Sequence, residues 1–123
     1  EAKIRGDTEY VVWGTGNPKR EFLYVDDMAG ACVLLMKQEI TGGIFNIGSG
    51  IDVTIKELAE TVMDVVGFSG NIVYDKTKPD GTPRKLLDVS RIAEIGWYPK
   101  IDLRAGIGKA YTSYLKSLAD GKL

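Results

Sequence analysis

The sequence contains no histidine and a single cysteine among its 123 residues. The absence of histidine removes the commonest metal ligand and the commonest general base near neutral pH. Cys32 has no partner for an internal disulfide, and its place inside an apolar run predicts a buried, reduced thiol in a cytoplasmic protein. No run approaches the ~20 apolar residues that span a bilayer, and the first ten residues lack a signal-peptide pattern, so we expect no membrane partner.

The sequence also has no excess of charge of either sign, since it contains 16 Lys and Arg residues and 17 Asp and Glu residues. Such a balance gives no general field that would attract nucleic acid, so any anion site must be local. The stretch "KPDGTPRK" is the clearest local concentration of positive charge, with Lys78, Arg84 and Lys85 around a Pro-Asp-Gly turn. A phosphate-reading nucleic-acid module has only this group in its favour, and we expect no nucleic-acid partner.

Hydrophobic spacing and turn residues predict short strands interleaved with three to four helices, an α/β or α+β fold in a single domain over residues 1–123. The clearest helix begins at Thr54, which has Glu57 at the spacing of a capping box, and stops at Gly67. The strands are expected at 10–14, 21–25, 44–48 and 71–75, and further helices at about 27–37, at 90–95 and after Asp102.

Two of these helices have predicted caps, and the first of them has a predicted buried face. Either Asp26 or Asp27 can cap the helix that runs to about Lys37, and Ser90 can cap the short helix that Gly96 ends. The first helix is expected to bury one apolar face, which consists of Met28, Cys32, Leu35 and Met36.

The glycine loops do not reproduce a dinucleotide-binding motif. Gly48 and Gly50 follow an expected strand, but Val53 stands where the third glycine of G-x-G-x-x-G belongs, and Gly14 and Gly16 are followed by Lys19. No metal ligand set or nucleophile–base pair is apparent.

Tyr74 and Lys78 match the Y-x-x-x-K spacing of short-chain dehydrogenases. However, Tyr74 ends a β-like run and Pro79 disfavours helix at Lys78, so we interpret this match as coincidence.

Several stretches together resemble the GDP-L-fucose synthase family, over about Glu9 to Leu115. They are "VVWGTGNPKREFLYVDDMA", "NIGSGIDVTIKELAETV", "KPDGTPRKLLDVSRI" and "IGWYP". The resemblance covers only the C-terminal, substrate-binding part of that family. It implies that the N-terminal Rossmann domain, which carries NADP(H), the catalytic Ser, Tyr and Lys, and the epimerising Cys and His, is absent from this chain. We therefore expect no catalytic residue and no bound cofactor here.

The resemblance assigns substrate contacts to Trp13, Arg20, Asp80 and Lys85. Arg20 and Lys85 suit a diphosphate, while Trp13 and Asp80 suit the nucleotide pocket, because guanidinium groups chelate phosphate and an indole offers a stacking face. The residues alone leave other roles open: Trp13 as core, Asp80 as a turn residue, and Arg20 paired with Glu21 or Asp26. For Arg84 a salt bridge with Asp88 is favoured over a second phosphate contact.

The implied function is that of the GDP-sugar-binding lobe of an NADP-dependent epimerase and reductase that makes GDP-L-fucose. The expected partners are the GDP-sugar, the missing Rossmann domain and, through the surface left uncovered, a second copy of the chain. The alternatives are a lobe of another nucleotide-sugar epimerase or dehydratase, and a self-associating module without catalysis.

Overall fold

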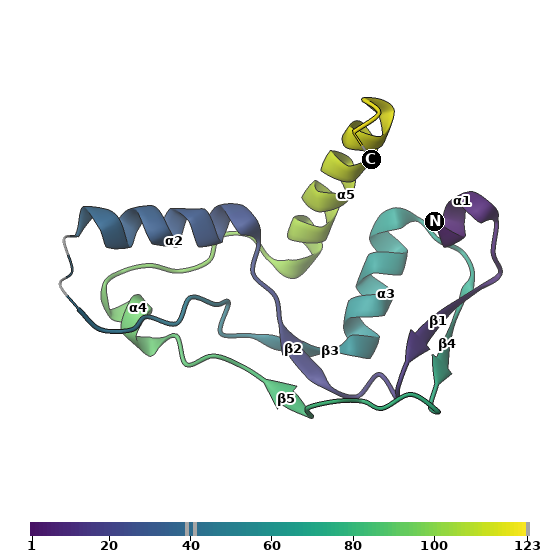
Figure 1. The fold of residues 1–123 in the computed structure, drawn as a ribbon, viewed down its shortest axis with the longest axis horizontal. Helices are drawn as coiled ribbons and strands as arrows, with labels where there is room; N and C mark the ends of the chain where they lie inside the picture. The colour runs from purple at the N-terminus through teal and green to yellow at the C-terminus, as the bar shows by residue number, and fades with distance from the viewer. Residues whose placement is uncertain (39, 41, 123) are drawn as a thin grey trace.

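The structure, a computed structural model, describes residues 1–38, 40 and 42–122. Two small sheets and the helices around them form a mixed α/β fold, which confirms the predicted fold class (Figure 1). In the first sheet, β1 (Glu9–Trp13) pairs in parallel with β4 (Asn71–Asp75). In the second, β2 (Lys19–Glu21) lies between β3 (Asp52–Thr54), to which it is antiparallel, and β5 (Arg84–Lys85), to which it is parallel.

Five helices accompany these strands in the described residues. The short N-terminal helix α1 was not predicted from the sequence, and no helix among the described residues is long and apolar enough to cross a membrane. The helices are α1 (Ala2–Arg5), α2 (Val25–Lys37), α3 (Ile55–Val66), α4 (Ser90–Glu94) and α5 (Leu103–Ala119).

Helix α3 begins at its predicted capping box, and α5 begins directly after Asp102, as predicted. The Thr54 hydroxyl accepts a hydrogen bond from Glu57 N at 3.0 Å, and the Glu57 carboxylate accepts one from Thr54 N at 2.7 Å. Gly67 ends α3 with a φ of 66°, a conformation that costs glycine little. The Asp102 carboxylate caps α5 by accepting from Ala105 N at 2.8 Å. Such caps contribute about 0.5–2 kcal/mol each.

The predicted cap of α2 is wrong. The helix starts at Val25 after Tyr24, and no side chain caps it. Asp27 is instead 6% exposed, and its Oδ2 accepts hydrogen bonds from Lys100 N at 3.0 Å and Ile101 N at 2.9 Å. The acidic residue of the first turn therefore connects α2 to the segment that leads into α5.

The predicted buried face of α2 is wrong at Met28, Cys32 and Met36 but correct at Leu35, which is partly buried against the core. Asp27 and Ala31, one turn apart, are the buried residues of the helix, whereas Cys32 is exposed and Met36 is 80% exposed. Residues four apart share a helix face, so the position of Asp27 also determines which residues turn inward. The side with Met28, Cys32 and Met36 faces outward.

Residues 44–48 do not form the predicted strand. Ile44 is 84% exposed, and Asn46 connects the segment to the chain before α4 by donating from Nδ2 to Asp88 O at 3.0 Å. No strand among the described residues lies alongside it, so its backbone has no ladder to join. The strand expected at 21–25 lies at Lys19–Glu21, and Ser90 is the first residue of α4 rather than its cap.

The main core lies between α2 and α4, at one end of the molecule (Figure 1). Ala31, Ile92 and Trp97 are buried there, and Ile92 is only 1% exposed. Burying such a side chain contributes about 1.5–3 kcal/mol. The partly buried residues around this cluster are Leu23, Leu34, Leu35, Phe45, Ile47, Val89 and Ile95. The three-stranded sheet lies between this core and the β1–β4 pair, and it carries the charged residues of interest.

Candidate nucleotide-binding site

Arg20 and Lys85, far apart in the sequence, are direct neighbours in the second sheet. They are register partners in the parallel pair β2–β5, and neighbouring strands lie about 4.8 Å apart. Because side chains alternate along a strand, paired residues project from the same sheet face. Neither residue has an ion-pair partner within the described part of the chain. The sheet therefore presents two uncompensated positive side chains side by side.

The guanidinium of Arg20 lies near the turn glycine of "KPDGTPRK". Its Nη1 donates to the neighbouring carbonyl oxygen of Lys19 at 2.6 Å, and its Nη2 lies 3.9 Å from where a Cβ on Gly81 would stand. Gly81 has a φ of 72°, as expected of glycine in such a turn. The connection between β4 and β5 thus returns to β2 beside Arg20.

Asp80 holds this connection against the loop after β1. One carboxylate oxygen, Oδ1, accepts from Thr15 N at 2.6 Å, and Oδ2 accepts from the Thr15 hydroxyl at 2.7 Å. Both bonds lower the pKa of Asp80 below its ordinary value, and the bond from the Thr15 backbone N–H has the larger effect. These contacts to a residue 65 positions away support the alternative in which Asp80 has a structural role in the turn.

Trp13, the last residue of β1, is 71% exposed and is not part of the core. The Nζ of Lys78 lies 5.6 Å from the centroid of its ring, within range of a cation–π contact. Trp13 also borders an open groove of about 570 Å³ between β1 and α3. The other residues of the groove are Tyr10, Val11, Val12, Ile55, Leu58, Ala59 and Val62.

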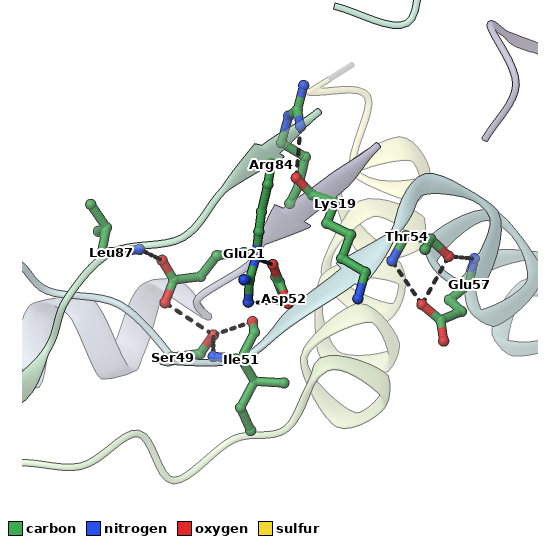
Figure 2. Close-up of polar contacts among 10 residues, drawn as sticks. Lys19, Glu21, Ser49, Ile51, Asp52, Thr54, Glu57, Arg84 and Leu87 are labelled. Atoms are coloured by element: carbon green, nitrogen blue, oxygen red, sulfur yellow. Dashed lines mark hydrogen bonds and ion pairs between the residues drawn. The ribbon is translucent and has the colours of Figure 1, made fainter. Parts of the chain in front are cut away.

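Arg84 forms an ion pair, but its partner is Asp52 of β3 and not Asp88 as predicted (Figure 2). The Arg84 Nε donates to Asp52 Oδ2, and Nη2 lies 3.3 Å from Oδ1. This contact lowers the pKa of Asp52 and raises that of Arg84. Asp88 instead accepts from Ser90 N at 3.0 Å. By strand alternation Arg84 projects from the sheet face opposite to Lys85, so it is not part of the positive pair.

Glu21 is a residue of this region that the sequence did not reveal. Its carboxylate accepts hydrogen bonds from Gly50 N at 2.6 Å and Leu87 N at 3.1 Å, and the Ser49 hydroxyl lies 3.4 Å away (Figure 2). Leu87 follows Lys85 by two residues, so Glu21 fixes the end of β5 beside β2. No sequence signal marked it, because its partners lie 28 to 66 positions away.

Tyr74 and Lys78 do not share a helix face. Tyr74 lies in β4, and its ring is close to Gly16. A Cβ on Gly16 would stand 2.5 Å from Cε1 of the Tyr74 ring. Lys78 lies in the following loop, above Trp13. The spacing thus lacks the helical geometry of a dehydrogenase pair. Within the described residues, no group of three or more acidic, cysteine or histidine side chains is placed to hold a metal ion.

Comparison with known proteins agrees with this architecture. Residues 2–48 match the sequence model of the NAD dependent epimerase/dehydratase family. A GDP-mannoheptose C4 reductase from Campylobacter jejuni, solved with NADP bound, superposes with a TM-score of 0.77 at 37% identity, over 87% of this chain and 35% of that chain. The fold is therefore that of a segment of an extended short-chain dehydrogenase, the class of sugar-nucleotide epimerases and reductases.

Curated relatives narrow the class to one enzyme family. GDP-L-fucose synthase 1 of Arabidopsis thaliana is 56% identical over 120 residues, covering 98% of this chain and 37% of that protein. The GDP-L-fucose synthase of Escherichia coli K12 is 46% identical over 127 residues, covering 95% of this chain and 39% of that protein. The chain is thus homologous to GDP-L-fucose synthases, which confirms the resemblance found in the sequence. It spans somewhat more than a third of their length.

Proposed function

We propose that this chain is the GDP-sugar-binding segment of an NADP-dependent enzyme that makes GDP-L-fucose. The reaction proposed for the longer enzyme is 3,5-epimerisation of GDP-4-keto-6-deoxy-D-mannose followed by reduction at C4. The observation that carries the proposal is the register pairing of Arg20 with Lys85, which presents on one sheet face two cations that have no ion-pair partner among the described residues.

In this proposal Arg20 and Lys85 bind the diphosphate. The planar guanidinium of Arg20 suits two phosphate oxygens at once, and the Lys85 ammonium adds a point charge. Trp13 supplies an exposed indole face for the nucleobase or sugar, since its side chain projects from the end of β1 instead of entering the core. The loop that Asp80 fastens lies between these two parts of the site.

The residues of this chain do not fit a dinucleotide cofactor. A pyrophosphate loop needs free backbone N–H groups, but the Glu21 carboxylate accepts from Gly50 N, and the Asp80 carboxylate accepts from Thr15 N. Both glycine loops are therefore occupied by negative charge. We propose that NADP(H) and the catalytic groups belong to the part of the longer enzyme outside these residues, and that this chain alone has no activity.

Exposed apolar residues of α2 and of the segment that follows it support the same arrangement. They are Val25, Met36, Ile44 and Ile51, each at least 66% exposed. We propose that this surface packs on the Rossmann domain of the longer enzyme. Light scattering tests the claim, because the isolated chain should self-associate as its concentration rises. A strict monomer at high concentration would count against an uncovered interface.

The direct test is a titration of GDP into the ¹⁵N-labelled chain, followed by amide chemical shifts. We expect shifts centred on β2 and β5, with a dissociation constant on the order of 1 mM because only part of the pocket is present. Arg20→Ala and Lys85→Ala should each weaken binding about three- to tenfold, or ~0.7–1.4 kcal/mol. Lys109→Ala, which removes an exposed lysine on α5, is the matched control. Absence of shifts at millimolar GDP would refute nucleotide binding by this chain.

A further inference from the structure

We propose that Glu21 is a positioning residue of the nucleotide site, which holds Lys85 beside Arg20 by fixing the end of β5. The inference rests on the proposed function, because it assigns a task within that same site. Glu21 acts through the backbone around Lys85, so it promotes the binding of a diphosphate although its own negative charge repels one.

The direction of the Glu21 side chain is the first support. Glu21 follows Arg20 in β2, so the two side chains project from opposite faces of the sheet. Arg20 shares its face with its register partner Lys85, whereas the Glu21 carboxylate contacts Gly50 N and Leu87 N. No ion pair joins Glu21 to Arg20 in the described part of the chain. The acid next to the proposed phosphate ligand therefore does not neutralise it.

Each oxygen of the Glu21 carboxylate holds a different segment of the chain (Figure 2). Oε1 accepts from Gly50 N at 2.6 Å and lies 3.4 Å from the Ser49 hydroxyl, while Oε2 accepts from Leu87 N at 3.1 Å. Hydrogen bonds to an ionised acceptor are stronger than those to a neutral one. One carboxylate thus ties the loop before β3 to the residue two positions after Lys85.

Strand β5 depends on such contacts because it consists of two residues, Arg84–Lys85. Its entry is fixed to β2 by the hydrogen bond from Lys19 N to Pro83 O, at 2.8 Å. Its exit is fixed to β2 by the bond from Leu87 N to Glu21. Lys85 lies between these two points, so loss of the second frees the backbone on the C-terminal side of Lys85.

The loop beside Glu21 has space for the carboxylate because residue 48 is glycine. Gly48 is buried, and a Cβ on it would stand 2.4 Å from Oε1 and 2.9 Å from Oε2 of Glu21. The φ of Gly48 lies outside the left-handed region, so its backbone conformation by itself permits alanine. Gly48→Ala is therefore a second way to displace the carboxylate, from the side opposite to β5.

The test measures GDP binding by amide chemical shifts of the ¹⁵N-labelled full chain, at constant ionic strength because salt screens the charges. Glu21→Gln, Lys85→Ala and the double variant are compared with the original chain. Glutamine has one acceptor oxygen, so it cannot accept from both Gly50 N and Leu87 N. Glu94→Gln, which neutralises an exposed glutamate of α4, is the matched control.

Gly48→Ala tests the same contact without changing any charge. Its matched control is Gly108→Ala, because nothing lies within 4 Å of a Cβ built on Gly108. The amide shift of Leu87 without ligand reports whether its bond to Glu21 is lost, and the remaining spectrum reports folding. If Glu21→Gln does not fold, the comparison of the two alanine variants decides.

We expect Glu21→Gln and Gly48→Ala each to weaken GDP binding about two- to fivefold, and both controls to leave it unchanged. The charge of Glu21 acting alone predicts the opposite sign, since removal of an acid favours an anion. In the Lys85→Ala chain, Glu21→Gln should have no further effect, because no ammonium is left to position.

Two results would show that the positioning role is wrong while the proposed function stands. One is unchanged or tighter GDP binding in Glu21→Gln and Gly48→Ala. The other is a loss in Glu21→Gln that is equally large with and without Lys85, because a general disturbance of the fold acts in both backgrounds. If the original chain does not bind GDP, the proposed function and the positioning role fail together.

Discussion

Replacing Asp27 by asparagine should destabilise the folded chain, whereas the same change at the neighbouring Asp26 should have almost no effect. Both residues lie in the first turn of α2, so both interact similarly with its dipole, a contribution of about 0.3–1 kcal/mol. Only Asp27 is buried, and only Asp27 accepts hydrogen bonds from Lys100 N and Ile101 N. The difference between the two variants therefore isolates those two bonds.

The magnitude follows from the chemistry of the acceptor. A hydrogen bond to a charged group contributes about 1.5–3 kcal/mol and a neutral one about 0.5–1.5 kcal/mol. Asparagine retains one oxygen at the place of Oδ2 but loses the charge, so Asp27→Asn should cost about 1–2 kcal/mol. Asp27→Ala leaves two backbone donors without an acceptor, at about 1–3 kcal/mol each, and should cost ~3 kcal/mol once water reaches them.

Urea unfolding followed by circular dichroism measures these differences. The midpoint should fall in the order Asp26→Asn, Asp27→Asn and Asp27→Ala, with an unchanged dependence on urea concentration. For a chain of this size, 1 kcal/mol corresponds to about 3–6 °C in the melting temperature. Equal midpoints for the two asparagine variants would refute the reasoning, because the connection between α2 and residues 100–101 would then contribute nothing.

Three further predictions concern the core, the thiol and the ion pair. Ile92→Ala should cost about 2–5 kcal/mol in a denaturation experiment, while Ile44→Ala, at an exposed position, should stay within about 0.5 kcal/mol. Cys32 should react with a thiol reagent at the rate of an exposed cysteine without denaturant, and a rate that requires unfolding would contradict its position on α2. The pKa of Asp52 is lowered by Arg84, so this pair contributes stability above the unfolded pKa, near pH 4, and loses it as pH falls through the folded value. Arg84→Gln should flatten the decline in melting temperature between pH 5 and pH 3, and an unchanged decline would exclude the pair as its source.

The elements that the sequence predicted correctly are those whose signals are local. The capping box of Thr54 and Glu57, the stop at Gly67 and the start of α5 after Asp102 each involve residues within a few positions. The run at 71–75 also formed its strand, because β1 lies beside it. Local chemistry was sufficient wherever a helix satisfies its own backbone or a strand finds its neighbour within the chain.

The wrong predictions concern elements whose structure depends on contacts with residues far away in the sequence. Residues 44–48 have the composition of a strand, but they have no neighbouring strand among the described residues and remain outside any sheet. The inward face of α2 follows from the contact of Asp27 with residues 73 and 74 positions away. Hydrophobic spacing suggested a different face that included Cys32, because apolar side chains occur on both sides of this helix.

The same holds for the candidate site: the sequence identified the residues, but their neighbours in space came from the structure. The turn chemistry of "KPDGTPRK" was readable, and family resemblance directed attention to Arg20 and Lys85, but their register pairing required the β2–β5 ladder. Arg84 and Lys85 are adjacent cations, and their charge alone does not indicate which of them is available to bind phosphate. Strand alternation separates them, since Arg84 turns toward Asp52 and Lys85, on the other face, has no ion-pair partner in the described part of the chain.

The two glycine loops explain why phosphate binding would depend on side chains here. In an anion-binding loop, glycine permits backbone N–H groups to converge on a phosphate. In this chain glycine makes room for carboxylates instead: a Cβ on Gly48 would stand 2.4 Å from Glu21 Oε1, and one on Gly14 would stand 2.3 Å from Asp80 Oδ1. These acids accept from the loop N–H groups and place negative charge where a phosphate would otherwise lie. In the proposed site, a diphosphate would therefore be held by the cations on the sheet, Arg20 and Lys85.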